Sequence, residues 1–278
     1  MRNKSFLKLL QYDLNIGFSI NLPKYIISAL FIAILCAKFY SNLSASEGIP
    51  NGNIIDCYMY IFKGMKVYNA ENGDPFMIPF DWLILQSLIG LLIIQYPTQD
   101  LHSYGTQLLI RSRSRVFWWI SKCIWNFATV LMFYLLSFII AIVFSAVFGD
   151  LSLIPNIKVN EFSSLIDLKD VQINFTFYIS IFILPILTSV AVSLLQMMLS
   201  FLINPVISFL LIVGVMAASA YCHTPFFVGN YTMILRNKAI YESGFNNTNI
   251  IIIDLLIVIL SVIVGLLYFK GTDILKRD

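Results

Sequence analysis

The sequence predicts an all-α membrane protein with six transmembrane helices, an N-terminal interfacial amphipathic helix, and both termini in the cytoplasm. Three observations lead to this fold class. First, 59% of the 278 residues are hydrophobic and only 12% are charged, with a mean hydropathy of +0.82, whereas about a quarter of the residues of a soluble domain are charged. Second, six apolar segments are separated by polar loops. Third, basic residues gather in alternate loops, as they do in membrane proteins.

The six apolar segments are each expected to cross the membrane, because a spanning helix needs about 20 apolar residues. They cover residues 25–40, 80–97, 124–148, 177–203, 206–222 and 250–269. The first is short, but Lys38 can extend its ammonium group to the membrane surface. Only Asn204 and Pro205 separate the fourth and fifth segments, which predicts a tight helical hairpin. Pro185 is expected to kink the fourth.

The distribution of Lys and Arg predicts which loops are cytoplasmic, because cytoplasmic loops carry the excess of basic residues. The two ends of the chain and the loop between the second and third spans together hold eleven basic residues. The loops on the other side hold six over a longer sequence. The cytoplasmic side therefore includes both termini and the loop formed by residues 98–123. Residues 41–79, 149–176 and 223–249 form the outer loops.

Residues 4–18 form a separate amphipathic pattern before the first span. The apolar residues Leu7, Leu10, Leu14 and Phe18 recur at spacings of three and four, as on one face of a helix. Lysines lie on the other face, which is typical of a helix lying along the membrane interface.

The whole chain, residues 1–278, is expected to be one transmembrane domain, because no loop is long enough to bury a core of its own. In the first outer loop, residues 54–65 show helical spacing and predict a short helix on the outer surface. A secretory signal peptide is not expected, because a polar segment of 24 residues precedes the first apolar run.

Several kinds of site are not expected. The four cysteines form no CxxC pair and are predicted to be single buried thiols, with only Cys57 clearly in an outer loop; the others are Cys36, Cys123 and Cys222. The two histidines, His102 and His223, are far apart and have no partners at metal-ligand spacing. The net charge of +3 does not indicate nucleic-acid binding. The pattern GxxxxGK[ST] is absent, so the chain is not expected to hydrolyse ATP, and no enzyme motif stands in its place.

The cytoplasmic loop 98–123 contains a short apolar segment directly before its arginines. Gly105 can end the helix of the second span, and Thr106 can cap a new short helix. Leu108, Leu109 and Ile110 give that helix an apolar face, and exposed apolar patches mark interaction sites. The alternative is that these residues enter the lipid interface while the arginines bind anionic headgroups. The neighbouring Trp118 and Trp119 are interpreted as membrane-interface anchors.

This loop resembles the coupling loop of the type-2 ATP-binding-cassette permease family. The matching positions are Gly105, Thr106, Leu108, Leu109, Ser114, Arg115 and Lys122, and the chain has Arg113 where the family often has proline. The six-span plan, the N-terminal amphipathic helix and the cytoplasmic termini are also similar to that family over nearly the whole chain.

The resemblance implies a membrane subunit of an ATP-driven exporter in a bacterial cytoplasmic membrane. A separate ATP-binding subunit, which holds ATP and Mg²⁺, would dock on residues 104–122, and two permease chains would form a homodimer or heterodimer. This chain would itself bind no cofactor or metal. Small permeases of this kind often resemble systems for antimicrobial-peptide export or self-protection, which implies an amphipathic or peptide-like cargo. A non-transporting scaffold or sensor that uses the same loop remains the main alternative, and a secondary transporter is a third.

Polar residues within the spans are candidates for the substrate path, because polar groups in a membrane interior are costly and often functional. They are Gln86, Gln95, Gln196 and Asp254. Asp254 is expected at headgroup level, since it lies only a few residues inside the outer end of the last span. The glutamines can instead hydrogen-bond between helices.

Overall fold

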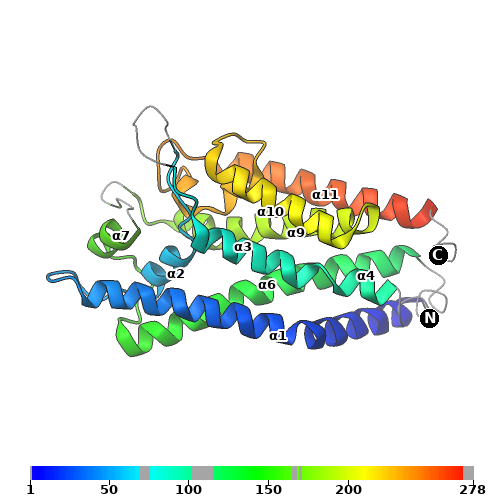
Figure 1. Ribbon diagram of the computed structural model, residues 1–278, viewed down its shortest axis with the longest axis horizontal. Helices are drawn as coiled ribbons and strands as arrows, with labels where there is room; N and C mark the ends of the chain where they lie inside the picture. Colours follow the sequence, from blue (N-terminus) through cyan, green and yellow to red (C-terminus); the bar gives the residue numbers. More distant parts are fainter. Residues whose placement is uncertain (1, 69–75, 102–114, 165–167, 169–170, 272–278) are drawn as a thin grey trace.

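The computed structural model describes residues 2–68, 76–101, 115–164, 168 and 171–271. Within these ranges the regular secondary structure is helical, without strands, as the sequence predicts. The long helices run side by side along one axis (Figure 1). The start of α1, α4, the start of α6 and the end of α11 meet at one end, called here the basal end; α2 and α7 lie at the other, the distal end.

Five helical stretches are long and apolar enough to cross a membrane: Phe6–Ser44, Phe80–Leu101, Arg115–Phe148, Phe175–Leu202 and Asn247–Lys270. The chain is therefore a helical membrane protein. The predicted fifth span corresponds to α10, Pro205–Tyr221, which is apolar but has only 17 residues. A sixth crossing and the side on which the termini lie remain predictions.

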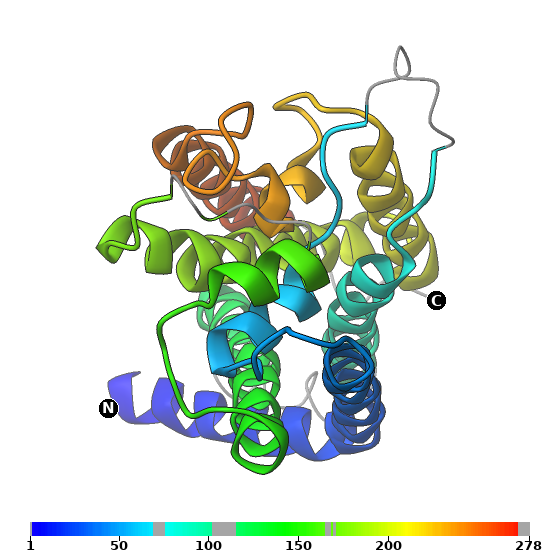
Figure 2. The same ribbon diagram turned by 90° about the vertical axis from the view of Figure 1, so that its left-hand side faces the viewer.

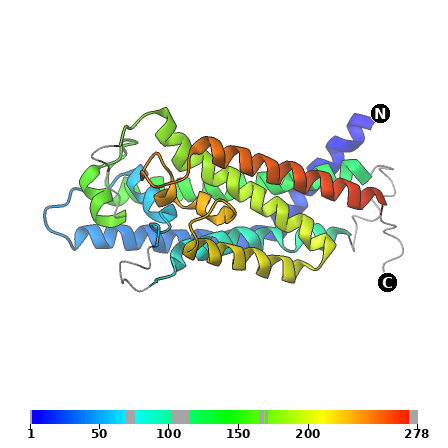
Figure 3. The same cartoon turned by 90° about the horizontal axis from the view of Figure 1, so that it is seen from above.

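Helix α1, Arg2–Ser44, joins the expected interfacial helix and the first span into one element. Pro23 lies inside it, and a proline in a helix removes one backbone hydrogen bond and bends the axis. In Figure 2, which looks along the long helices, the N-terminal part of α1 lies across them, and Figure 3 shows the same divergence. Its location at a membrane interface is not tested by this geometry.

Side chains near this bend satisfy the end of the next long helix. Helix α3, Phe80–Ile93, stops shortly before α4, Tyr96–Leu101, and the last carbonyl groups of a helix lack partners within it. Asn21 Nδ2 and Lys24 Nζ each donate a hydrogen bond of 2.8 Å, to the carbonyl oxygens of Leu92 and Leu91 respectively. The break between α3 and α4 is thus held by α1.

Helix α2, Ile54–Phe62, forms where the sequence predicts a short helix, but all nine of its residues are buried. The prediction of a helix on the outer surface is therefore wrong. Asn53 caps the helix, and the Asp56 side chain accepts from Asn53 N at 3.1 Å, from Asn156 N at 2.9 Å and from Asn160 Nδ2 at 2.5 Å. These bonds draw in the loop that leads to α7, Ile157–Ser164. Segments that come before and after α6 in the sequence thus both pack against α2.

Helix α6, Arg115–Phe148, carries the two tryptophans that were expected at the membrane interface. Trp118 and Trp119 are instead 0% and 1% exposed. Both rings pack against Phe201 and Phe269. The expectation is wrong because the aromatic rings of Phe201 on α9 and Phe269 on α11 cover these indoles inside the protein.

The fourth predicted span is built from α8, Phe175–Tyr178, a π-helical turn, Ile179–Ile183, and α9, Leu184–Leu202. Pro185 is the second residue of α9, and its carbonyl oxygen accepts a hydrogen bond of 3.2 Å from Tyr134 Oη. The predicted hairpin to α10 is confirmed, with Asn204 Oδ1 accepting from Val206 N at 2.9 Å. The last helix, α11, covers Asn247–Gly271.

Arg236 is 1% exposed and holds together the distal segment between α10 and α11. This segment contains two 3₁₀ turns, Val228–Thr232 and Ile234–Arg236. The guanidinium donates to the carbonyl oxygens of Met65, Lys66, Ser219 and Ala220 and to Asn230 Oδ1. Burial lowers the pKa of Arg236 to about 10, so the group stays charged at neutral pH, and carbonyl dipoles compensate its charge.

We expect Arg236→Met to lower the thermal unfolding temperature of the detergent-solubilised protein markedly. The substitution leaves buried carbonyl groups without donors, and such groups cost about 1–3 kcal/mol each. Lys238→Met is the matched control, because Lys238 is exposed on the same segment. Equal unfolding temperatures for the two variants would show that the guanidinium does not hold this segment.

Stability should depend on pH through Asp56. Burial raises the pKa of Asp56 to about 6 from an ordinary value of 3.8, although the three N–H donors act in the opposite direction. The folded protein therefore binds this proton more tightly than the unfolded chain does. Its stabilising contribution is complete below pH 3.8 and is lost as the pH rises through 6.

Relative to Asp56→Asn, which cannot titrate, the wild-type protein should thus become less stable by up to about 3 kcal/mol between pH 4 and 7. Thermal unfolding of both proteins across this range measures the difference. A wild-type protein that instead gains stability over Asp56→Asn as the pH rises would contradict the assignment.

Candidate coupling and transport sites

The predicted docking residues divide into two groups. Gly105, Thr106, Leu108, Leu109 and Ile110 lie outside the described residues, and the structure does not test them. Arg115 and Lys122 are described, and both lie on α6. Arg115 Nη1 donates to the carbonyl oxygen of Phe269 at 3.3 Å, which links the start of α6 to the end of α11.

Lys122 lies in a cluster of buried charges at the basal end. Its Nζ atom is 2.7 Å from Asp13 Oδ1 and 2.6 Å from Asp100 Oδ2. Lys122 and Asp13 are 0% exposed and Asp100 is 4% exposed. The three residues, called here the basal charge cluster, come from α6, α1 and α4. Two ion pairs without access to water therefore join three helices.

Neighbouring polar and aromatic groups compensate the cluster further. Asp13 accepts a hydrogen bond of 2.9 Å from Tyr96 Oη and another from Ser121 Oγ. The ring centres of Tyr96 and Trp118 lie 4.2 Å and 5.2 Å from Lys122 Nζ, within the range of a cation–π contact. Such added bonds are needed because removing paired charges from water costs several kcal/mol per ion.

The cluster joins the two helices that flank residues 102–114 in the chain. Asp100 precedes Leu101, the last residue of α4, and Lys122 lies two turns into α6, which begins at Arg115. Asp13 connects both helices to the N-terminal part of α1. Since the Lys122 ammonium is enclosed, it is not available for direct contact with a partner, and its predicted part in docking stays a prediction.

Sequence reasoning missed Asp13, Tyr96 and Asp100. Asp13 belongs to a row of buried residues spaced by four, Leu9, Asp13, Gly17, Asn21 and Tyr25. The apolar face predicted from spacing is different, and its Leu7 is 61% exposed. The signal that could have indicated the protein-facing side of α1 was the spacing of Asp13, Gly17 and Asn21 by four residues, which places a carboxylate, a glycine and an amide on one side of the helix.

A Cβ atom at Gly17 would lie 2.0 Å from Trp125 Nε1, so only glycine allows this contact.

Two of the predicted substrate-path residues share one small cavity within the bundle. Gln86 on α3 and Gln196 on α9 line it together with Gly90, Ser189 and Ser193. Gln196 Nε2 donates to the Gly90 carbonyl oxygen at 2.9 Å, and Gln86 Oε1 lies 3.4 Å from Ser189 Oγ. Within the described part of the chain, Gln86 Nε2 and Gln196 Oε1 have no hydrogen-bond partner. The structure thus forms a polar seam between α3 and α9.

Gln95 and Asp254 lie elsewhere. Gln95 is exposed between α3 and α4. Asp254 on α11 is 0% exposed, and its Oδ2 atom accepts a hydrogen bond of 2.6 Å from Thr188 Oγ1 on α9. Asp254 is therefore buried between helices, where a headgroup-level position was expected instead; its depth in the membrane stays a prediction. Distance from the helix end indicated depth along the axis but not that this face of α11 packs against α9.

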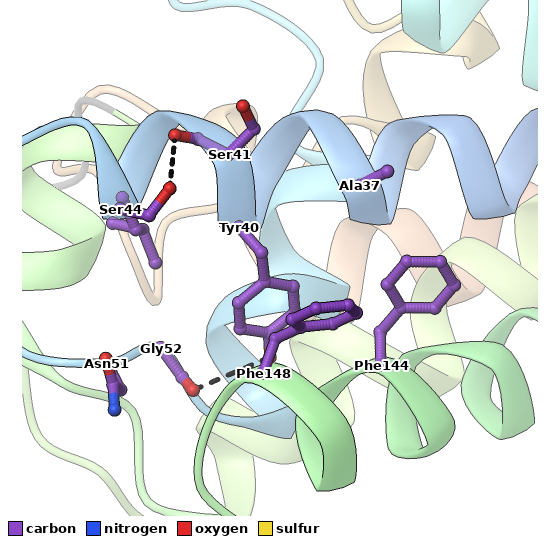
Figure 4. A pocket seen from close by; sticks show the side chains of 9 residues that line it. Ala37, Tyr40, Ser41, Ser44, Asn51, Gly52, Phe144 and Phe148 are labelled. Atoms are coloured by element: carbon purple, nitrogen blue, oxygen red, sulfur yellow. Dashed lines mark hydrogen bonds between the residues drawn. The ribbon is translucent and has the colours of Figure 1, made fainter.

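A cavity of about 320 Å³ opens between α1 and α6 at the distal end (Figure 4). Its wall combines aromatic rings with small polar groups, and the residues lining it include Ala37, Tyr40, Ser41, Asn51, Phe144 and Phe148. Tyr40 Oη is 2.7 Å from Ser145 Oγ, which fixes the ring at the cavity wall. None of these residues was a candidate in the sequence, because they are brought together only by packing of helices far apart in the chain.

These features define a polytopic helical membrane protein with a basal charge cluster, an intramembrane polar seam and a distal amphipathic cavity. Residues 30–275 match the family described as "Protein of unknown function (DUF2705)", and the chain belongs to that family. The matched region includes Asp100, Lys122 and all four predicted path residues. No match to a curated protein was found.

Replacing Lys122 tests the basal charge cluster. We expect Lys122→Met to destabilise the protein by about 3–5 kcal/mol, because it leaves two buried carboxylates without their cation. The double variant Lys122→Met with Asp13→Asn should recover part of the loss. Thermal unfolding in detergent measures both.

The matched control is Lys38→Met. Lys38 pairs with Asp81 at 3.0 Å, but their side chains are 51% and 44% exposed, and exposed pairs contribute about 1 kcal/mol or less. Similar losses from Lys38→Met and Lys122→Met would contradict the importance of the buried pairs.

Proposed function

We propose that this chain is the membrane-spanning permease subunit of an ATP-driven exporter of the type-2 ATP-binding-cassette kind. The observation that carries the proposal is the basal charge cluster, which joins α4 and α6, the helices before and after the docking segment, residues 102–114, to each other and to α1. The resemblance of residues 104–122 to a coupling loop and the set of long apolar helices also support it.

The cluster gives the docking segment a mechanical connection to the bundle. Separating Lys122 from a buried carboxylate costs several kcal/mol. A displacement of the docking segment therefore moves α6 and the N-terminal part of α1 with it, rather than being absorbed by a loose loop. The contact between Arg115 and the carbonyl of Phe269 extends the connection to α11.

The energy source is a separate ATP-binding subunit that holds ATP and Mg²⁺, because this chain has no phosphate-binding motif. It docks on Leu108, Leu109 and Ile110, and two permease chains assemble as a homodimer or heterodimer. The site of action is the bacterial cytoplasmic membrane, where lipid covers the exposed apolar faces of the helices.

The cargo that best suits the chain is amphipathic or peptide-like. The distal cavity offers aromatic rings beside hydroxyl and amide groups, which together fit a molecule with apolar and polar parts. The polar seam supplies two amide atoms without hydrogen-bond partners inside the bundle, Gln86 Nε2 and Gln196 Oε1. Both features are the chemical basis for this substrate class.

Docking is tested by replacing both Leu108 and Leu109 with Asp. We expect this variant to remain in the membrane. The amount of co-expressed ATP-binding subunit that purifies with it should fall more than about tenfold, because the apolar face becomes charged. The matched control makes the same replacement by Asp at Leu151 and Leu153, which are 66% and 54% exposed in a predicted outer loop. Undiminished co-purification of the Leu108/Leu109 variant would refute docking at this face.

A non-transporting scaffold or sensor would also bind a partner through this loop. The two functions separate when the complex with the ATP-binding subunit is reconstituted in lipid vesicles and supplied with amphipathic peptides. Peptide-stimulated ATP hydrolysis with peptide movement supports transport, whereas hydrolysis without peptide movement supports the scaffold. A neighbouring reading frame that encodes a GxxxxGK[ST] protein would favour transport.

A further inference from the structure

Two of the four cysteines touch each other in the distal half of the bundle. Cys36 lies on α1 and Cys57 on α2, 21 residues apart in sequence, and their sulfur atoms are 3.5 Å apart. Both are 0% exposed. A disulfide has a sulfur–sulfur distance of about 2.05 Å, so the two thiols need to approach by roughly 1.5 Å to form one.

The surroundings keep these thiols in register. Phe39, from the turn after Cys36, packs its ring 5.2 Å from the ring of Tyr60, which follows Cys57 by three residues. Asn53 and Asp56 fix the start of α2 through reciprocal hydrogen bonds. Because both helices are held on either side of the sulfur atoms, the contact is a property of the packed helices.

The other two cysteines have different positions. Cys123 lies beside Lys122 near the start of α6, and Cys222 follows the end of α10. These helix ends lie at opposite ends of the bundle (Figure 1). All four cysteines are free in the structure. The chain therefore contains one adjacent pair of thiols and two further thiols that serve as internal references.

We propose that Cys36 and Cys57 are a disulfide-forming pair that covalently fastens α2 to α1 when the chain meets an oxidant on the outer side of the membrane. This inference is independent of the proposed transport function. Its oxidant is a small-molecule or protein disulfide. One cysteine thiolate attacks that disulfide and releases one thiol; the second cysteine thiolate then attacks the mixed disulfide and releases the other. Two electrons pass to the oxidant, and the two cysteine protons end on its released thiols.

The folded state protects the pair from rapid reaction. The hydrogen bond to Cys36 and burial raise the pKa of the Cys57 thiol well above its ordinary range, and the thiolate is the reactive form. Oxidation therefore occurs while the distal segments are still packing, or when they open transiently. Once formed, the disulfide resists reduction, because a reducing thiol does not reach the buried sulfur atoms.

The experiment counts free thiols in the full-length protein. Cells expressing the chain are grown with oxidised glutathione, and purified protein is separately warmed with oxidised glutathione to just below its unfolding temperature. Each sample is then denatured in detergent and labelled with a maleimide of high mass. We expect two labels after oxidation and four after reduction, and a peptide pair containing residues 36 and 57 that separates only on reduction.

Two variants make the count specific. Cys123→Ser with Cys222→Ser should change from two labels to none on oxidation, whereas Cys57→Ser should keep three in both states. The oxidised wild-type protein should also unfold several degrees higher than the reduced protein, and Cys57→Ser should show no such shift. Four labels after both oxidising treatments, or a crosslink that includes Cys123 or Cys222 in place of this pair, would overturn the proposal.

Discussion

The enclosure of Lys122 between Asp13 and Asp100 is the interaction on which the basal end of the structure depends. A buried ammonium tolerates only an arrangement in which carboxylates approach within hydrogen-bond distance. That requirement fixes the N-terminal part of α1 against α6, and α4 against both. The same contact brings the indole of Trp125 onto Gly17, and it sets the direction in which the chain leaves α4 for the docking segment. If Lys122 moves, all of these positions move.

The distal end is organised by a different kind of compensation. There the buried Arg236 has five acceptors, four backbone carbonyl oxygens and one side-chain amide. Asp56, in turn, accepts from two backbone N–H groups and one side-chain amide. Each charge orders irregular backbone that would otherwise have unpaired polar groups. The two ends of the molecule thus differ in how their buried charges are compensated: ion pairs join whole helices at the basal end, whereas backbone dipoles order loops at the distal end.

The proposed function uses this difference. The end that would receive a partner is crosslinked by buried ion pairs, so a displacement there is passed to the helices. Between the ends lie unpaired amide groups of Gln86 and Gln196, beside Gly90 and small hydroxyl side chains. Buried polar atoms without partners are uncommon in folded proteins and call for an explanation. A substrate path along this seam is the explanation that the proposed function offers.

The sequence by itself determined the helical membrane class, the positions in the chain of five long apolar helices, the hairpin at Asn204 and the existence of a short helix near residue 54. Composition and local spacing carry this information because lipid requires continuous apolar helices whose backbone groups are paired internally. The tertiary structure alone decided which side of each helix faces protein. It buried Trp118, Trp119, Asp254 and α2, all expected nearer a surface, and it brought Asp13 to Lys122 and Cys36 to Cys57. Helices in a membrane protein are apolar on nearly every side, so spacing does not distinguish a lipid-facing side from a protein-facing one. Contacts between residues far apart in the chain make that choice.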